Sequence, residues 1–262
     1  MTPRGRRLLA VVVVLVLVGG AYAGWRVWQG RGATVPPDAS LTEQCREVPS
    51  SAQRITLTAS DGEILGGALV GSEDATVGLV LRHGASQTIC DWLPWAGSVA
   101  DSAGVRVLLF DRRGFGSSPG TPSLSAEPGD TVLAVDRLRQ EGVDRVLTMA
   151  SSMGNSVMFS ALPDLPEKPC GVISVSPVLR SGDAGGSVDG SRIAGLPDNL
   201  WVTWESGNPS IVANAQRVLD AAGPGAHAHA VDTTDHSIVL VDNHADVRDF
   251  LAEAAASCGS GS

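Results

Sequence analysis

The sequence predicts an α/β protein built on a mostly parallel, doubly wound sheet of about eight strands, with an antiparallel opening hairpin, helices on both faces and a minimal cap. Three observations predict this class. Several short runs are apolar throughout, as in strands buried on both faces. Stretches with the helical spacing of apolar residues separate these runs. Two strand-like segments near the start are joined by Asp61-Gly62, a pair typical of hairpin turns.

Strands and helices are expected to alternate along the chain. The glycine- and serine-rich stretch Leu179–Asp198 is expected to be a long mobile loop. Helices are predicted at Trp92–Ala103, Asp130–Glu141, Asn155–Leu162, Ser210–Ala222 and Asn243–Ala256. Strands are predicted at Gln53–Ala59, Glu63–Val70, Thr76–Arg82, Val105–Phe110, Arg145–Ala150, Gly171–Val175, Leu200–Trp204 and Ala226–Val231.

Residues 1–28 are expected to be either a signal peptide or a single N-terminal transmembrane anchor. A basic flank, Arg4–Arg7, precedes the uncharged apolar run Leu8–Trp25. An A-x-A motif at residues 21–23 would suit cleavage. The run is also close to the shortest length that spans a bilayer, and Trp25 and Trp28 are typical of a membrane interface. Both interpretations predict that the rest of the chain lies outside the cytoplasm.

Beyond this segment we expect a linker at residues 29–45, one domain at 46–258 and a disordered tail at 259–262. The formal net charge is -9, and several of the basic residues lie in the first 31 positions. The remaining chain is therefore strongly acidic and would repel nucleic acid. We expect a monomer without a cofactor, which would meet a membrane only through an uncleaved N-terminal segment.

The expected export indicates that the four cysteines form disulfides, because disulfides form in oxidising compartments. Their spacing fits no metal site, and they allow three pairings. Cys170 begins a predicted strand at the amino end of the sheet, and Cys258 ends a helix that returns to the same end. We therefore expect disulfides between Cys170 and Cys258 and between Cys45 and Cys90.

The segment around Ser152 predicts a sharp turn between a strand and a helix. An apolar run stops just before Ser152, and a helical pattern follows it. Small residues stand two positions before and after it, at Ala150 and Gly154, where a tight turn leaves no room for bulk. The Met153 amide would begin the helix, where the dipole favours a developing negative charge.

A serine hydroxyl needs a base to become a nucleophile. His236 is the candidate for that base, since it follows the last predicted strand in the polar segment Asp232–Ser237. The carboxyl ends of parallel strands share one edge of the sheet, so both side chains could meet there.

The order of these motifs resembles that of the α/β-hydrolase superfamily over residues Gln53–Ala256. His83-Gly84 follows the third strand, Asp111–Ser117 follows the fourth, and Ala150–Gly154 matches the nucleophile elbow with alanine in place of its first glycine. The resemblance implies that Ser152 is the nucleophile and His236 the general base. It further implies that the backbone N–H groups of Met153 and Ala85 form the oxyanion hole.

The third member of the triad stays open among three residues. The position at which the family usually carries aspartate falls on Asn208. An amide can orient an imidazole but cannot balance the charge of an imidazolium. Glu205, at the end of a predicted strand, and Asp183, after the preceding strand, are the carboxylate candidates.

The resemblance predicts a serine hydrolase that cleaves a small-molecule carboxylic ester through an acyl-enzyme. Two alternatives remain: a binding protein with an impaired site, and an acyltransferase that uses the same nucleophile. His83 is expected to brace its loop. His227, His229 and His244 could suggest a metal, but histidines on a solvated face are commoner, so no metal is expected.

Overall fold

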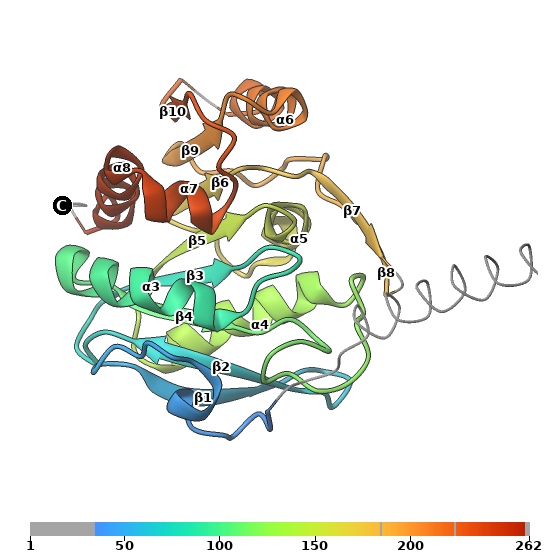
Figure 1. Ribbon diagram of the computed structural model, residues 1–262, viewed down its shortest axis with the longest axis vertical. Helices are drawn as coiled ribbons and strands as arrows, with labels where there is room; N and C mark the ends of the chain where they lie inside the picture. The colour runs from blue at the N-terminus through green and yellow to red at the C-terminus, as the bar shows by residue number, and fades with distance from the viewer. Residues whose placement is uncertain (1–34, 184, 223, 260–262) are drawn as a thin grey trace, which may run out of the picture.

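The computed structural model describes residues 35–183, 185–222 and 224–259. Its main sheet has eight strands in the order β1-β2-β4-β3-β5-β6-β9-β10 (Figure 1). β1 and β2 form an antiparallel hairpin, β2 is also antiparallel to β4, and the later neighbours are parallel. The predicted sheet is thereby confirmed. The strands are β1 (Gln53–Thr58), β2 (Ile64–Val70), β3 (Val77–Arg82), β4 (Arg106–Phe110), β5 (Arg145–Ser151), β6 (Gly171–Val175), β9 (Leu200–Glu205) and β10 (His227–Val231).

Helices cover both faces of the sheet, as the apolar strands predict. Successive β3 residues alternate between the faces: Leu79 and Leu81 pack with α3, α7 and α8, whereas Val80 packs with α4. α5 and α6 cover the later strands on the α4 side. The helices are α2 (Leu41–Gln44), α3 (Ile89–Ala103), α4 (Glu127–Gln140), α5 (Gly154–Ala161), α6 (Pro209–Asp220), α7 (Ile238–Asn243) and α8 (Ala245–Ala256).

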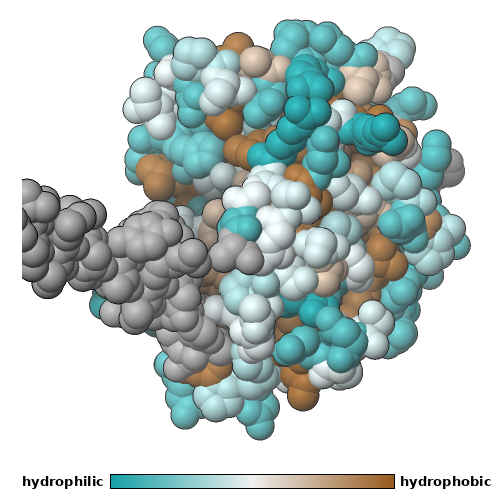
Figure 2. Space-filling view, turned by 90° about the vertical axis from the view of Figure 1, so that its right-hand side faces the viewer, coloured by the Kyte–Doolittle hydropathy of each residue, from teal (hydrophilic) through white to brown (hydrophobic). Residues whose placement is uncertain are grey.

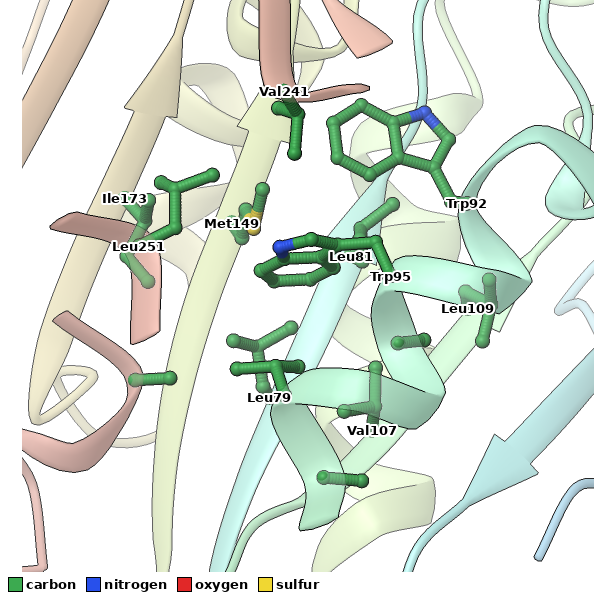
Figure 3. Close-up of a cluster of buried hydrophobic side chains, with 14 of the residues drawn as sticks. Leu79, Leu81, Trp92, Trp95, Val107, Leu109, Met149, Ile173, Val241 and Leu251 are labelled. Atoms are coloured by element: carbon green, nitrogen blue, oxygen red, sulfur yellow. The ribbon is translucent and has the colours of Figure 1, made fainter. Parts of the chain in front are cut away.

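The two tryptophans of α3 belong to the core. Trp92 is fully buried, Trp95 is 7% exposed, and their rings meet edge to face with centroids 5.8 Å apart. Figure 3 shows both rings among side chains from β3, β4, β5 and β6, with Val241 of α7 and Leu251 of α8 nearby. These tryptophans therefore join α3 to the sheet and to the C-terminal helices.

Several helices begin elsewhere than the sequence predicts. α3 begins at Ile89 instead of Trp92, because Thr88 and Asp91 form a capping box and the Asp111 carboxylate accepts the Ile89 N–H at 2.9 Å. α4 begins at Glu127, three residues before the predicted Asp130. The last predicted helix begins at Ala245, and the short helix α7 precedes it.

The stretch Leu179–Asp198 contains regular structure where the sequence predicts only a loop. It forms the hairpin of β7 (Arg180–Asp183) and β8 (Gly186–Asp189). Val188 packs with Leu124, Met153 and Val157. This packing against α5 explains why a glycine-rich segment still forms two paired strands.

The two disulfides join Cys45 to Cys90 and Cys170 to Cys258, the pairs that the expected topology favours. The segment before β1 is held in place as well: Leu41 is buried, and Gln44 Nε2 donates to the Asp111 carboxylate at 2.7 Å. In the described part of the chain, no helix has the length and apolar character needed to cross a bilayer. The expected leader or anchor at residues 1–28 and the tail from 260 onward lie outside the described residues.

Candidate active site

Ser152 lies at the turn between β5 and α5. Its φ of 52° is a left-handed conformation that residues other than glycine rarely adopt. A Cβ added to Gly154 would lie only 2.6 Å from the Arg82 carbonyl oxygen. The turn therefore needs glycine at that position, because the start of α5 passes directly against the end of β3. This local geometry fits the elbow that the small residues around Ser152 predict.

His236 lies between β10 and α7, with its ring beside Ser152. Its Nε2 is 2.8 Å from Ser152 Oγ, and its Nδ1 is 2.6 Å from Glu205 Oε1. A carboxylate can only accept a hydrogen bond, so Nδ1 carries the ring proton and donates a hydrogen bond to Glu205. Nε2 is then the acceptor that faces the serine hydroxyl. This is the arrangement a general base needs.

Glu205 is the last residue of β9 and is fully buried. Its second oxygen, Oε2, accepts a hydrogen bond from Ser176 Oγ at 2.7 Å. Ser176 Oγ in turn accepts from the backbone N–H of Ser237 at 3.0 Å. Both carboxylate oxygens are therefore partnered, which offsets the cost of burying the charge.

Neither of the other two acid candidates contacts His236. Asn208 is the N-cap of α6, where its Oδ1 accepts from the backbone N–H of Ser210 at 3.2 Å. Asp183 lies on the β7–β8 hairpin and accepts from Arg112 Nη2 at 2.8 Å. The structure thus brings Ser152, His236 and Glu205 together, and it leaves Asn208 and Asp183 in structural roles.

The expected oxyanion donors both belong to segments close to Ser152. Met153 follows Ser152 directly, and Ala85 lies in the loop after β3. A Cβ added to Gly84 would be 3.1 Å from Ser152 Cβ, so this loop passes close to the elbow. Among the described residues, neither the Met153 nor the Ala85 N–H donates a backbone hydrogen bond. Both N–H groups are therefore available to donate to a negatively charged oxygen bound near Ser152.

His83 braces the loop that carries Ala85. The Arg112 N–H donates to its Nε2 at 3.3 Å, so the ring proton sits on Nδ1, which donates to the Gly84 carbonyl oxygen at 2.8 Å. Burial, with the adjacent Arg82 guanidinium, lowers the pKa of His83 to about 3. The ring is therefore neutral under physiological conditions and fixes the path of the loop.

The remaining histidines have partners outside the triad. His227 stacks on Trp201 with ring centroids 3.8 Å apart. His229 pairs with Asp246 and His244 with Asp235, each at 3.2 Å. Within the described ranges, no group of three or more metal-ligating side chains is close enough to hold an ion.

The sequence motifs do not identify three polar residues that complete the site, Gln87, Ser176 and Ser237. Ser237 directly follows His236, and Ser176 directly follows the end of β6, so the neighbouring histidine and the strand end were the available signals. Gln87 carries no such signal, because it precedes a helix and its partner Ser237 is 150 positions away.

Figure 2 views the face toward which β3 and β5 point in Figure 1. Residues of nearly neutral hydropathy cover much of its centre, and the hydrophobic residues form small separate spots outside the grey atoms. The visible part of this face therefore carries no broad apolar surface.

Curated relatives match only part of this chain. The uncharacterized protein YfhR of Salmonella typhi is 30% identical over an alignment of 128 residues, and the match covers 44% of this chain and 41% of that protein. Thiohydrolase aneE of Aspergillus aculeatus is 38% identical over an alignment of 89 residues, and the match covers 32% of this chain and 28% of that protein. The chain therefore spans less than half the length of these relatives.

Solved structures match over most of the chain. An esterase of Pyrococcus furiosus has a TM-score of 0.65 and 15% identity, covering 86% of this chain and 98% of its own. A serine hydrolase without a lid from Xanthomonas campestris has a TM-score of 0.61 and 19% identity, and the match covers 80% of this chain and 95% of that chain. At these identities the likeness establishes the fold alone.

A family described as Serine aminopeptidase, S33, matches residues 74–232, which is more than half of the chain and includes the elbow and Glu205. The chain therefore belongs to this family and, with it, to the α/β-hydrolase superfamily.

Proposed function

We propose that this protein is an exported serine hydrolase that cleaves carboxylic esters through an acyl-enzyme on Ser152. The observation that carries the proposal is the hydrogen-bonded chain from the buried Glu205 through His236 to Ser152 Oγ. Each link has the donor and acceptor that nucleophilic catalysis requires.

In the first half-reaction, Ser152 Oγ attacks the carbonyl carbon of the ester while His236 Nε2 takes the hydroxyl proton. The Met153 and Ala85 N–H groups would stabilise the negative charge on the carbonyl oxygen. The carbon–oxygen bond then breaks, and the alcohol leaves with the proton from Nε2. The Glu205 carboxylate stabilises the imidazolium that exists between these steps.

In the second half-reaction, water gives a proton to Nε2 and attacks the acyl carbon. The bond to Ser152 Oγ breaks, the serine recovers its proton, and the acid is released. An alcohol or sugar in place of water would turn the same reaction into acyl transfer.

The surroundings of Ser152 favour small or medium esters. The β7–β8 hairpin is a minimal cap, and its Val188 lies in a small apolar cluster with Met153, the residue next to the nucleophile. The visible neutral surface in Figure 2 offers no broad site for a lipid aggregate. We therefore expect short acyl chains to be preferred.

Export is the second part of the proposal. Two disulfides suit an oxidising compartment, and the apolar run at residues 8–25 suits a leader or an anchor. We propose that residues 46–258 form a monomeric domain outside the cytoplasm, either released or tethered by the N-terminal segment.

The test combines labelling with a fluorophosphonate and turnover of three short substrates: a p-nitrophenyl ester, a thioester and an aminoacyl p-nitroanilide. We expect labelling and ester hydrolysis in the wild type and neither in Ser152→Ala. Ser102→Ala, which removes an exposed hydroxyl on α3, is the matched control and should behave as the wild type.

Turnover of the anilide or the thioester alone would contradict ester specificity. Absence of both labelling and turnover would instead favour a non-catalytic binding protein.

A further inference from the structure

Gln87 lies between the loop that carries Ala85 and the first turn of α3. Its half-buried side-chain amide contacts two separate parts of the site. Oε1 is 2.8 Å from the backbone N of Gly84 and 3.0 Å from Trp92 Nε1. Nε2 is 2.9 Å from Ser237 Oγ. This one amide therefore joins the loop after β3 to the loop after β10.

The chemistry of the partners fixes the orientation of the amide. A backbone N–H and an indole N–H can only donate, so the atom that faces both of them must be the oxygen. The nitrogen of Gln87 then faces Ser237 and donates to its hydroxyl. The Ser237 hydroxyl proton is left for one of two acceptors, Ser151 Oγ or Gln87 Oε1.

Three groups in this network are one residue away from a group that the proposed reaction uses. Gly84 precedes Ala85, a proposed oxyanion donor. Ser237 follows His236, the proposed base. Ser151, which hydrogen-bonds to Ser237 Oγ, precedes the nucleophile Ser152.

Other hydrogen bonds hold each loop separately: the His83 ring donates to the Gly84 carbonyl oxygen, and the Ser237 N–H donates to Ser176 Oγ. Ala85 and Ser86 are exposed, and Gly84 has no side chain to pack. Ser237 has φ of 62°, a conformation that persists only where surrounding contacts hold it. The hydrogen bonds of the Gln87 amide add one contact to each loop and join the two loops to each other.

We propose that Gln87 is a positioning residue that aligns the Ala85 N–H and the His236 ring on Ser152. The inference rests on the proposed hydrolase function. Gln87 itself does not contact His236 or Ser152 by hydrogen bond; it acts through Gly84, Ser237 and, beyond Ser237, Ser151.

The test measures the rate of fluorophosphonate labelling, kcat and KM in the full-length chain. Gln87→Ala should lower the labelling rate and kcat by about 10–100-fold, with KM within about two-fold, because misalignment affects the transition state more than binding. Gln87→Glu still accepts from Gly84 and Trp92 but no longer donates to Ser237. It should therefore retain more activity than alanine.

Ser237→Ala removes the hydrogen bonds of its hydroxyl to Gln87 and to Ser151. Combined with Gln87→Ala, it should lower the rate by less than the product of the two single losses, because the two residues share one hydrogen bond. Gln53→Ala, an exposed change on β1, is the control and should label at the wild-type rate. Thermal unfolding of each variant shows whether it folds, and Gln87→Glu and Ser237→Ala preserve the test if the alanine variant does not.

Labelling of the folded Gln87 variants at the wild-type rate would overturn the proposal while leaving the hydrolase intact. A rise in KM without loss of kcat would also overturn it. A wild type that does not label at Ser152 would overturn the proposed function itself, and the positioning role with it.

Discussion

In the described chain, the residues other than glycine that have a positive φ are all serines: Ser152 at 52°, Ser176 at 46° and Ser237 at 62°. All three belong to the candidate site. Each such conformation is unfavourable by roughly 1–3 kcal/mol and persists where the surrounding structure over-determines it. The strain is therefore concentrated where Ser152, Glu205 and His236 meet, as expected of a site whose geometry must be fixed before a substrate arrives.

Substitution of two of the three candidates for the third triad position tests the triad residue by residue. Glu205→Gln should lower kcat by about 10³–10⁴-fold, because an amide cannot balance the imidazolium charge. Asn208→Ala should leave kcat unchanged and reduce the free energy of unfolding by about 0.5–2 kcal/mol, since it removes the N-cap of α6.

Ester kinetics and urea denaturation of both variants measure these effects. A large loss of kcat in Asn208→Ala, with little loss in Glu205→Gln, would reverse the assignment.

At the scale of single residues, the sequence identifies those site residues whose positions depend on local motifs. The small residues around Ser152 identify the elbow, and His236 follows from its place after the last strand. The acid stayed open because Glu205, Asn208 and Asp183 all lie near strand ends, and only the folded backbone decides which one faces Nδ1. Gln87 could not be predicted, since its role depends on Ser237, 150 positions away.

Among the elements, the β7–β8 hairpin shows where composition misleads. Its glycines predict a loop, yet one apolar side chain, Val188, anchors it beside Met153, the N-cap of α5, and Val157 of α5. Asp183 adds an ion pair with Arg112 at 2.8 Å. The sequence gives no periodic signal for this packing, because a four-residue strand with one buried position has no measurable alternation.

α4 is joined to the sheet by the buried carboxylate of Glu127. Its two oxygens pair with Arg82 at 2.6 Å and with Arg112 at 2.9 Å, and all three side chains are at most 2% exposed. Glu127→Gln should lower the free energy of unfolding by about 3–5 kcal/mol, because both guanidinium groups lose their buried counter-charge.

The control is Glu167→Gln. Glu167 pairs with Arg139 at a similar 2.7 Å but is 67% exposed, so the expected loss is below about 1 kcal/mol. Equal losses for the two variants in urea denaturation would show that the buried pairs contribute no more than a surface pair.

For the whole molecule, the order of elements was predictable because buried strands and amphipathic helices alternate clearly. The helix boundaries were less predictable, because side chains distant in sequence decide them. An example is Asp111, which accepts a hydrogen bond from the first N–H of α3. The two pairs of cysteines then cross-link the assembled layers.

The disulfide between Cys170 and Cys258 joins the start of β6 to the end of α8 across 88 positions. Replacing both cysteines by serine should lower the free energy of unfolding by about 2–5 kcal/mol, chiefly through the larger entropy of the unfolded chain. Urea denaturation measures the change, with the Cys45/Cys90 double variant for comparison, whose shorter span of 45 predicts a slightly smaller loss. A loss below about 1 kcal/mol would contradict this account.

The two cross-links also follow one another along the chain without overlapping: Cys45 joins the next cysteine, Cys90, and Cys170 joins the next after that, Cys258. A polypeptide that enters an oxidising compartment from its N-terminus would expose its thiols in this same order. An oxidase that couples each newly arrived thiol to the one still unpaired would then produce the native connectivity directly. Export as proposed would therefore require an oxidase for this protein but no isomerase to reshuffle wrong pairs.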